Sequence, residues 1–375
     1  MALDTVEILR TLVAFDTTSH RSNLALIHWV LAYLDGHGIE VRLTHSDDGA
    51  KANLLATIGP DPDAAGGIVL SGHTDVVPIA DQAWDSDPFT LVERDGRFHG
   101  RGSADMKGFI AACLAAVPRW CSLNVRRPIH LAFSYDEEVG CFGVARLIAD
   151  LRMHIRSPAL AIIGEPTGMR IGLTHRGFYG CRTTFRGRPA HSGDPSLGAS
   201  AIEPAALLVA QLATFGRALS MQGNRTTLNI GRISGGSAIN IVPGCCEVLW
   251  EFRPTDEAST AAVEAEVDRL LAATPPGVAV EMVHVARVPS LAARYGSAAV
   301  NIARALGARW PPGEVPFGTE AGFFEQAGIP SLVCGPGAIA QAHQPNEWIA
   351  ASELRSADQF MAGIGAWATT AVAPG

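Results

Sequence analysis

Three apolar segments that lie far apart in the chain each end in side chains able to bind a metal. Short apolar runs of this kind are typical of buried strands. They are residues 67–71, followed by His73 and Asp75; 129–134, followed by Asp136, Glu137 and Glu138; and 160–163, followed by Glu165. In open parallel sheets, side chains just beyond the carboxyl ends of the strands meet in one crevice. The sequence therefore predicts one polar site at the edge of an α/β sheet.

A fourth apolar segment and a glycine-rich turn add two further candidates. Residues 331–334 lead through Gly335-Pro336-Gly337 toward His343, and Asp105 lies in the turn at 100–108, ahead of an apolar helix. Histidines and carboxylates without a thiolate form a nitrogen and oxygen set that suits zinc, cobalt or manganese. The donors are numerous enough for two divalent metal ions.

Each candidate, taken singly, also has a structural interpretation. A histidine after a strand is usually a satisfied polar group, and Asp75 suits turn chemistry. Glu137 and Glu138 suit a solvated pair, and Asp105 suits a helix N-cap. Their position on successive strand ends favours the functional interpretation.

The order of expected elements predicts an α/β catalytic domain, with a mostly parallel central sheet flanked by helices, and a smaller inserted α+β domain. A chain of 375 residues is longer than the roughly 250 to 300 residues at which single cores stop growing. Four amphipathic strands and two helical stretches place the inserted domain at 174–285, so the catalytic domain takes 1–173 and 286–375. Residues 60–67 and 311–318 are expected to be surface loops.

Charge and composition limit the partners. The formal net charge is -8 and no Lys/Arg run occurs, which argues against nucleic acid or an anionic membrane as partner. No uninterrupted apolar run approaches the ~18 residues of a membrane span. Asp4 and Glu7 make the first residues unlike a signal peptide, so we expect a cytoplasmic location. The seven cysteines include no CxxC pair and are expected to be reduced.

Seven motifs, in this order along nearly the whole chain, resemble the dinuclear-zinc peptidases and deacylases. That family includes aminoacylases, succinyl-diaminopimelate desuccinylases and acetylornithine deacetylases. The motifs are SGHTDVVP (71–78), GRGSADMKG (100–108), DEEVG (136–140), GEPT (164–167), GRPAHSGDPSLGASAI (187–202), GGSAINIVP (235–243) and AHQPNE (342–347). An ordered set of this length is highly specific.

The resemblance implies a ligand set. In it, His73 and Glu165 bind one zinc ion, Glu138 and His343 bind the second, and Asp105 bridges the two. It also implies a cis peptide bond after Asp105, and a homodimer.

Roles for three further residues combine chemistry with the resemblance. Glu137 neighbours Glu138 but points differently, so it is expected to take the proton of the attacking water and return it to the leaving amine. Asp75 is expected to accept the other ring N–H of His73. His191 matches a family histidine that steadies the tetrahedral oxyanion, from the partner subunit in dimeric members; a turn histidine is the alternative.

The substrate is expected to be a small N-acyl amino acid. Arg253 and Asn240 are placed to bind its α-carboxylate, although both also suit structural positions. FGTEAG (317–322) and CGPGAIAQAHQP (334–345) look most like acetylornithine deacetylases, which release ornithine and acetate in arginine biosynthesis. Glu320 either favours a cationic substrate side chain or orients a ligand.

Other activities remain open at this stage. A dipeptidase, a general aminoacylase or a desuccinylase would keep every metal ligand and differ in its pocket. A metal-free binding module requires a broken ligand set, and this set is intact. The chain has no G-x-S-x-G elbow, which disfavours a serine hydrolase.

Overall fold

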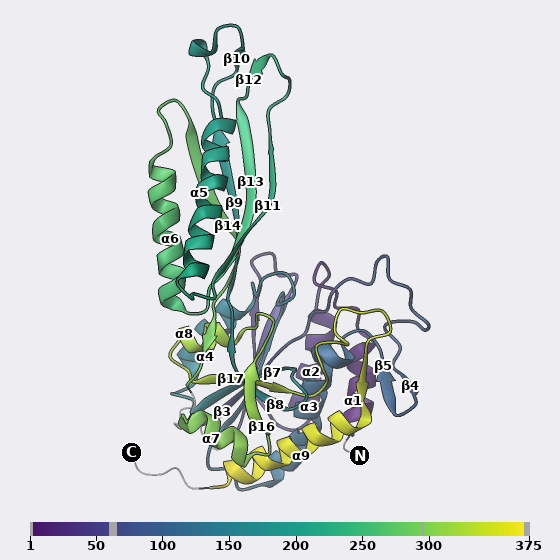
Figure 1. The fold of residues 1–375 in the computed structure, drawn as a ribbon. Helices are drawn as coiled ribbons and strands as arrows, with labels where there is room; N and C mark the ends of the chain where they lie inside the picture. Colours follow the sequence, from purple (N-terminus) through teal and green to yellow (C-terminus); the bar gives the residue numbers. More distant parts are fainter. Residues whose placement is uncertain (1–2, 60–65, 295, 371–375) are drawn as a thin grey trace. The chain divides into compact units, whose positions relative to one another are not determined.

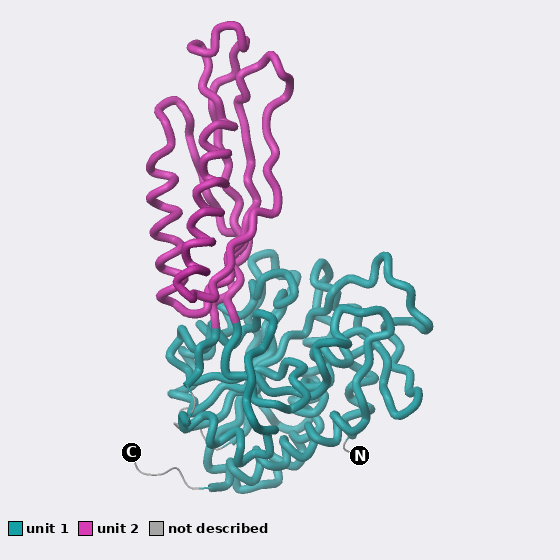
Figure 2. Tube along the Cα trace, viewed as in Figure 1, with its two compact units in different colours: residues 1–175, 291–375 teal, residues 176–290 magenta. Residues whose placement is uncertain are grey.

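The computed structural model describes residues 3–59, 66–294 and 296–370 (Figure 1). The chain divides into two compact units. Unit 1 comprises Met1–His175 and Leu291–Gly375, and unit 2 comprises Arg176–Ser290 (Figure 2). Unit 2 is thus an insertion between two segments that together form unit 1.

Within the described residues, unit 1 is built on a nine-stranded sheet of order β1-β2-β6-β3-β7-β17-β8-β15, with β16 beside β8. Parallel pairing joins β6, β3, β7 and β17 in the middle, and antiparallel pairing joins β1, β2 and β15 to the flanks. The strands are β1 (Val41–His45), β2 (Ala52–Ile58), β3 (Ile68–His73), β6 (Ile129–Ser134), β7 (Leu160–Pro166), β8 (Arg170–His175), β15 (Leu291–Ala292), β16 (Arg309–Glu314) and β17 (Ser331–Gly335). The predicted mostly parallel central sheet is confirmed.

The register of the central strands aligns their carboxyl ends. Ser71 on β3 lies opposite Ala132 on β6 and Ile163 on β7, and His73 lies opposite Ser134. Every residue of these three strands is buried. Polar residues at the ends of these strands, or just after them, therefore lie at one edge of the sheet.

Helices cover the sheet of unit 1. They are α1 (Thr5–Val13), α2 (Leu24–Asp35), α3 (Gly108–Ser122), α4 (Val144–His154), α7 (Ala298–Ala305), α8 (Ala321–Gln326) and α9 (Ala351–Ala368). A capping box starts α1, in which the Asp4 carboxylate accepts from the Glu7 N–H at 2.8 Å and the Asp4 N–H donates to the Glu7 carboxylate at 2.9 Å. Helices α3 and α9 are joined where the buried Trp120 indole donates to the Met361 carbonyl at 3.1 Å.

A three-stranded sheet completes unit 1. It consists of β4 (Val92–Arg94), β5 (Arg97–His99) and β18 (Trp348–Ala350), in the order β18-β5-β4. Antiparallel pairing of Trp348 with His99 brings the C-terminal part of the chain beside the segment that enters the glycine-rich turn.

Unit 2 pairs an antiparallel sheet with two helices. Its strands, in the order β11-β13-β9-β14, are β11 (Thr227–Gly235), β13 (Cys245–Arg253), β9 (Phe178–Arg186) and β14 (Ala279–Val288). Helix α5 (Ile202–Met221) contacts β11, β13 and β9, and it runs beside α6 (Glu257–Ala272) in Figure 1. The core between them includes Tyr179 and Phe252, whose rings stack at 4.7 Å. A short pair, β10 (Ala190–His191) and β12 (Ile241–Val242), extends from one end of the sheet.

The prediction of a surface loop over 311–318 was wrong for its first half. Residues Arg309–Glu314 form β16, although the segment contains Pro311 and Pro312. Proline cannot donate to a sheet and is therefore confined to edges and irregular pairings. The pairing of β16 with β8 skips from Arg309 to Gly313, and both prolines lie in that gap. The other expected loop, 60–67, falls almost entirely outside the described residues.

Helix α5 meets the length and composition of a membrane-spanning helix, although charged residues interrupt its apolar run. The same test is passed by core helices of proteins that contact no membrane. Helix α5 carries Glu203 and Arg217 and packs Leu208 and Leu212 into the core of unit 2. It is therefore weak evidence for a membrane span. All seven cysteines lie in the described part of the chain and are free thiols, as expected.

Candidate metal centre

An acidic side chain from β7 and another from the segment after β6 lie beside a histidine from β3. His73 is the last residue of β3, and its Nε2 lies 3.7 Å from Oε1 of Glu165, near the end of β7. Glu137 follows β6, and its carboxylate lies within 4.8 Å of the ligand atoms of His73 and Glu165. Three strand ends that the register aligns thus contribute to one cluster.

Asp105 lies between two histidines. It belongs to a kinked turn (Ser103–Lys107) that leads into α3, and its peptide bond to Met106 is cis, as the resemblance implied. Its Oδ1 is 3.0 Å from Nε2 of His73, and its Oδ2 is 3.4 Å from Nε2 of His343. Nε2 of His343 is also 2.9 Å from Oε2 of Glu138. Asp105 therefore faces one histidine with each oxygen, which is the geometry of a bridging carboxylate.

Asp75 holds this cluster in a way that differs from the expected one. Nδ1 of His73 lies 3.0 Å from the main-chain carbonyl of Asp75 and 3.7 Å from its carboxylate. The carboxylate accepts instead from the main-chain N–H groups of Glu137 at 3.1 Å and Glu138 at 3.3 Å, and from the Ser19 hydroxyl at 2.7 Å. Asp75 therefore fixes the His73 ring through its backbone and the Glu137–Glu138 segment through its side chain.

The electrostatics of the cluster are dominated by burial. Burial raises the pKa of Glu137 and of Glu165 well above the usual range, and raises the pKa of Glu138 to about 7. Burial also opposes ionisation of Asp105, but hydrogen bonds from His343 and His73 outweigh it and lower the pKa of Asp105. Carboxylates buried this close together repel one another when they are ionised. The cluster is therefore more favourable when it also holds positive charge.

The donor set fits a pair of divalent metal ions. The ligand atoms of His73, Asp105 and Glu138 form a second group within 4.8 Å of one another, beside the group of His73, Glu137 and Glu165. Two imidazoles and several carboxylates match the preferences of zinc, cobalt and manganese. Sγ of Cys141 lies 3.5 Å from Oε1 of Glu137, and burial raises the pKa of this thiol well above its usual range.

Glu320 faces the protein interior. It lies at the start of α8, is 1% exposed, and accepts from the Ser71 hydroxyl at 3.4 Å. Burial raises the pKa of Glu320 to about 7. It therefore lies in the protein interior beside Ser71, two residues before His73.

The remaining predicted site residues all lie in unit 2. His191 is exposed on β10 and its Nδ1 accepts from the Gly193 N–H at 3.0 Å. The main-chain carbonyl of Asn240 accepts from the Ser192 N–H at 3.0 Å, so His191 and Asn240 share one end of the unit. Arg253 lies at the far end of the nine-residue strand β13, where it pairs with Glu251 at 3.1 Å and stacks on Phe178.

Sequence reasoning missed two charged pairs beside the cluster. Arg101 and Glu347 form a buried ion pair at 2.8 Å, and each side chain is 1% exposed. Lys51 contacts both the Asp136 carboxylate and the Ser19 carbonyl. Arg101 belongs to the motif GRGSADMKG and Glu347 to the motif AHQPNE. Their opposite charges in two site motifs were the sequence feature that indicated an ion pair.

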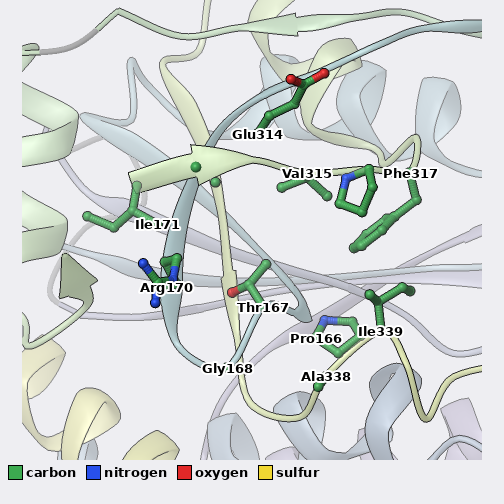
Figure 3. A pocket seen from close by; sticks show the side chains of 13 residues that line it. Pro166, Thr167, Gly168, Arg170, Ile171, Glu314, Val315, Phe317, Ala338 and Ile339 are labelled. Atoms are coloured by element: carbon green, nitrogen blue, oxygen red, sulfur yellow. The ribbon is translucent and has the colours of Figure 1, made fainter. Parts of the chain in front are cut away.

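A pocket of about 260 Å³ opens near the end of β7 (Figure 3). Its lining includes Pro166, which follows Glu165, and Phe317, three residues before Glu320. The lining also includes the apolar Ile339 and the charged Arg170. None of the clustered histidines and carboxylates lines this pocket.

Known proteins resemble this chain over most of its length. The profile of the peptidase family M20/M25/M40 matches residues 69–371. An acetylornithine deacetylase of Pasteurella multocida is 33% identical over 356 residues, which cover 91% of this chain and 90% of that protein. A second, from Proteus mirabilis, is 34% identical over 364 residues, covering 92% and 91%.

Solved structures show the same fold. An aminopeptidase of Bacillus cereus has a TM-score of 0.75 and 22% identity, with 98% of each chain covered. An M20 family metallo-carboxypeptidase of Sulfolobus solfataricus also has a TM-score of 0.75, with 16% identity over 98% of this chain and 99% of that one. Identities this low establish the architecture alone.

Proposed function

The chain belongs to peptidase family M20/M25/M40 and is a metallo-hydrolase, and from this premise we propose that it removes the acyl group from a small N-acyl amino acid. The favoured substrate is N-acetylornithine, since relatives at 33% and 34% identity over most of the chain bear the name acetylornithine deacetylase. The observation that carries the proposal is the position of Asp105, with one oxygen toward His73 and the other toward His343.

We propose that two divalent ions, zinc above all, bind where these side chains meet. His73 and Glu165 would hold one ion, Glu138 and His343 the other, and Asp105 both; the short distances within each pair support this division. When bound, such a pair of ions polarises the scissile carbonyl and lowers the pKa of a shared water.

Glu137 is the proposed general base and acid. Its carboxylate lies in the group with His73 and Glu165, whereas the Glu138 carboxylate lies in the group with His73 and Asp105. Asp75 fixes the main chain of Glu137 through its N–H, and the Cys141 thiol lies 3.5 Å from the Glu137 carboxylate. Glu137 would accept the proton of the attacking water and later donate it to the leaving amine nitrogen, which completes the cleavage of the amide.

His191, Asn240 and Arg253 are proposed to contact the substrate, and their spacing supports a homodimer. Arg253 and His191 lie toward opposite ends of β13, a strand of nine residues and therefore about 27 Å long. One copy of unit 2 cannot present both to a small substrate. If both act, as the resemblance implies, they come from two copies of the chain. A cytoplasmic location is part of the same proposal.

The burial of Glu320 favours one of its two predicted roles. A carboxylate that is 1% exposed and hydrogen-bonded to Ser71 is suited to orienting the cluster rather than to binding a cationic substrate group. Preference for ornithine would then depend on other residues.

Steady-state hydrolysis tests the proposal. N-acetylornithine, N-acetylmethionine, succinyl-diaminopimelate and a dipeptide are compared with added zinc or cobalt, and again after chelation. We expect metal-dependent hydrolysis with the highest kcat/KM for N-acetylornithine. A preference for another member of the panel would overturn the substrate, and metal-independent or absent hydrolysis of all four would overturn the mechanism.

A further inference from the structure

The carboxylate of Glu347 organises the turn that carries Asp105. Its Oε1 accepts from the main-chain N–H of Ala104 at 2.9 Å and of Asp105 at 3.1 Å. Its Oε2 accepts from the Gly102 N–H at 2.9 Å and from the Arg101 guanidinium at 2.8 Å. Four hydrogen bonds fill the acceptor capacity of one carboxylate. The side chain is buried, so water does not compete for these bonds.

Arg101 extends the same network to the loop that carries His343. Its Nη1 also reaches the Gln344 carbonyl at 3.4 Å, and its Nη2 donates to the side-chain oxygen of Gln82. Gln82 in turn donates through Nε2 to the main-chain carbonyl of His343 at 3.0 Å. The turn with Asp105 and the loop with His343 are therefore joined through Glu347, Arg101 and Gln82.

The His343 loop needs such support because its backbone is unusual. His343 and Asn346 have φ values of 62° and 57°, in the left-handed region that residues other than glycine rarely adopt. The loop ends at β18, and the main-chain carbonyl of Glu347 accepts from the Gly100 N–H at 2.9 Å. Glu347 is thus fixed through both its main chain and its side chain against the turn at 100–105.

We propose that Glu347 is a positioning residue that sets the direction of Asp105 and, through Arg101 and Gln82, couples Asp105 to His343 so that the two bind metal as one unit. The inference rests on the proposed metal site. Glu347 itself is not proposed to touch substrate or metal. It acts by holding the N–H of Asp105, which leaves the Asp105 carboxylate between the two histidines.

Glu347→Gln is the sharpest test because it keeps shape while changing hydrogen bonding. The amide nitrogen would replace one oxygen and meet two donors, so two of the four hydrogen bonds are lost. Partners that orient metal ligands typically contribute 10- to 100-fold to metal affinity, and we expect a loss of that size. Glu353→Gln is the matched control. Glu353 lies on α9, and its carboxylate pairs with Arg309 at 3.1 Å, outside the network of Glu347, Arg101 and Gln82.

The measurement is a titration of the folded, metal-free proteins with Co²⁺, followed by its visible absorption, with a zinc titration against a chelating competitor. We expect the Glu347→Gln protein to bind more weakly and to give an altered cobalt spectrum, and the Glu353→Gln protein to match wild type. A purely structural role for Glu347 would change the unfolding midpoint of the metal-free protein but leave both readouts unchanged, and that result would overturn the inference.

A second variant covers the case in which Glu347→Gln does not fold. Gln82→Leu removes the link to His343 and leaves the buried ion pair in place, and we expect a several-fold loss of affinity. Unchanged affinity and spectrum in Gln82→Leu would refute the coupling to His343. Wild-type protein that binds fewer than two ions would instead refute the proposed metal site itself, so the two failures are distinguishable.

Discussion

A buried histidine away from the metal centre makes the stability of unit 1 depend on pH. His130 is the second residue of β6, is fully buried, and has Nδ1 2.9 Å from the Thr57 hydroxyl. Its Nε2 has no partner among the described residues and faces Gly67, where an added Cβ would lie only 2.8 Å away. Burial lowers the pKa of His130 from 6.5 to about 4 because the site offers nothing that stabilises an imidazolium.

The sign and size of the effect follow from linkage. Between pH 6.5 and pH 4 the unfolded chain binds a proton that the folded chain does not, so the stabilisation is complete above pH 6.5 and is lost as the pH falls. The pKa of His130 falls from 6.5 in the unfolded chain to about 4 in the folded chain, which corresponds to ~3 kcal/mol in the free energy of unfolding. Of this, ~2 kcal/mol is lost between pH 7.5 and pH 5. Replacement by phenylalanine removes this dependence.

Urea unfolding of wild type and His130→Phe at pH 7.5, 6 and 5, with chelator present, isolates the effect. The chelator removes metal binding, and the comparison of the two proteins cancels the titration of the shared carboxylates. We expect wild type to lose ~2 kcal/mol more than the variant between pH 7.5 and pH 5. Parallel pH profiles for the two proteins would refute the reasoning, because His130 would then titrate alike in the folded and unfolded chain.

Three further predictions concern the site and its surroundings. Glu137→Gln should bind two ions with wild-type affinity yet lose 10²- to 10⁴-fold in kcat, and near-normal turnover would remove Glu137 from its proposed role. Gly164→Ala should lower the free energy of unfolding by at least ~1–3 kcal/mol, because the new Cβ would lie 2.0 Å from the buried ring of Phe109; an unchanged urea midpoint would contradict this. Mixing inactive His191→Ala and Arg253→Ala proteins should restore part of the activity, since a mixed dimer has one intact site, and no recovery despite subunit exchange would argue against shared sites.

The site was predictable from sequence where its geometry follows from the sheet. His73 and Glu165 end or nearly end apolar strands, and parallel pairing in register leaves their side chains at one edge. Residue type then identifies the chemistry. Strand β16 was not predictable in this way, because two prolines are a strong signal against pairing and the sequence does not reveal that the pairing skips them.

Glu347 shows a different limit, since its role depends on contacts that residue type does not encode. Its partners are three main-chain N–H groups and Arg101, and any sequence with the same backbone would offer the same three donors. A carboxylate four positions after His343 is equally consistent with a solvated loop residue. The distinction arises only when β18 pairs with β5 and brings Glu347 under the turn at 100–105. Residues that bind a metal can be inferred from their type and spacing. Residues that hold those ligands in place have to be inferred from tertiary hydrogen bonds. Glu347→Gln and Gln82→Leu would test the hydrogen bonds proposed to do so.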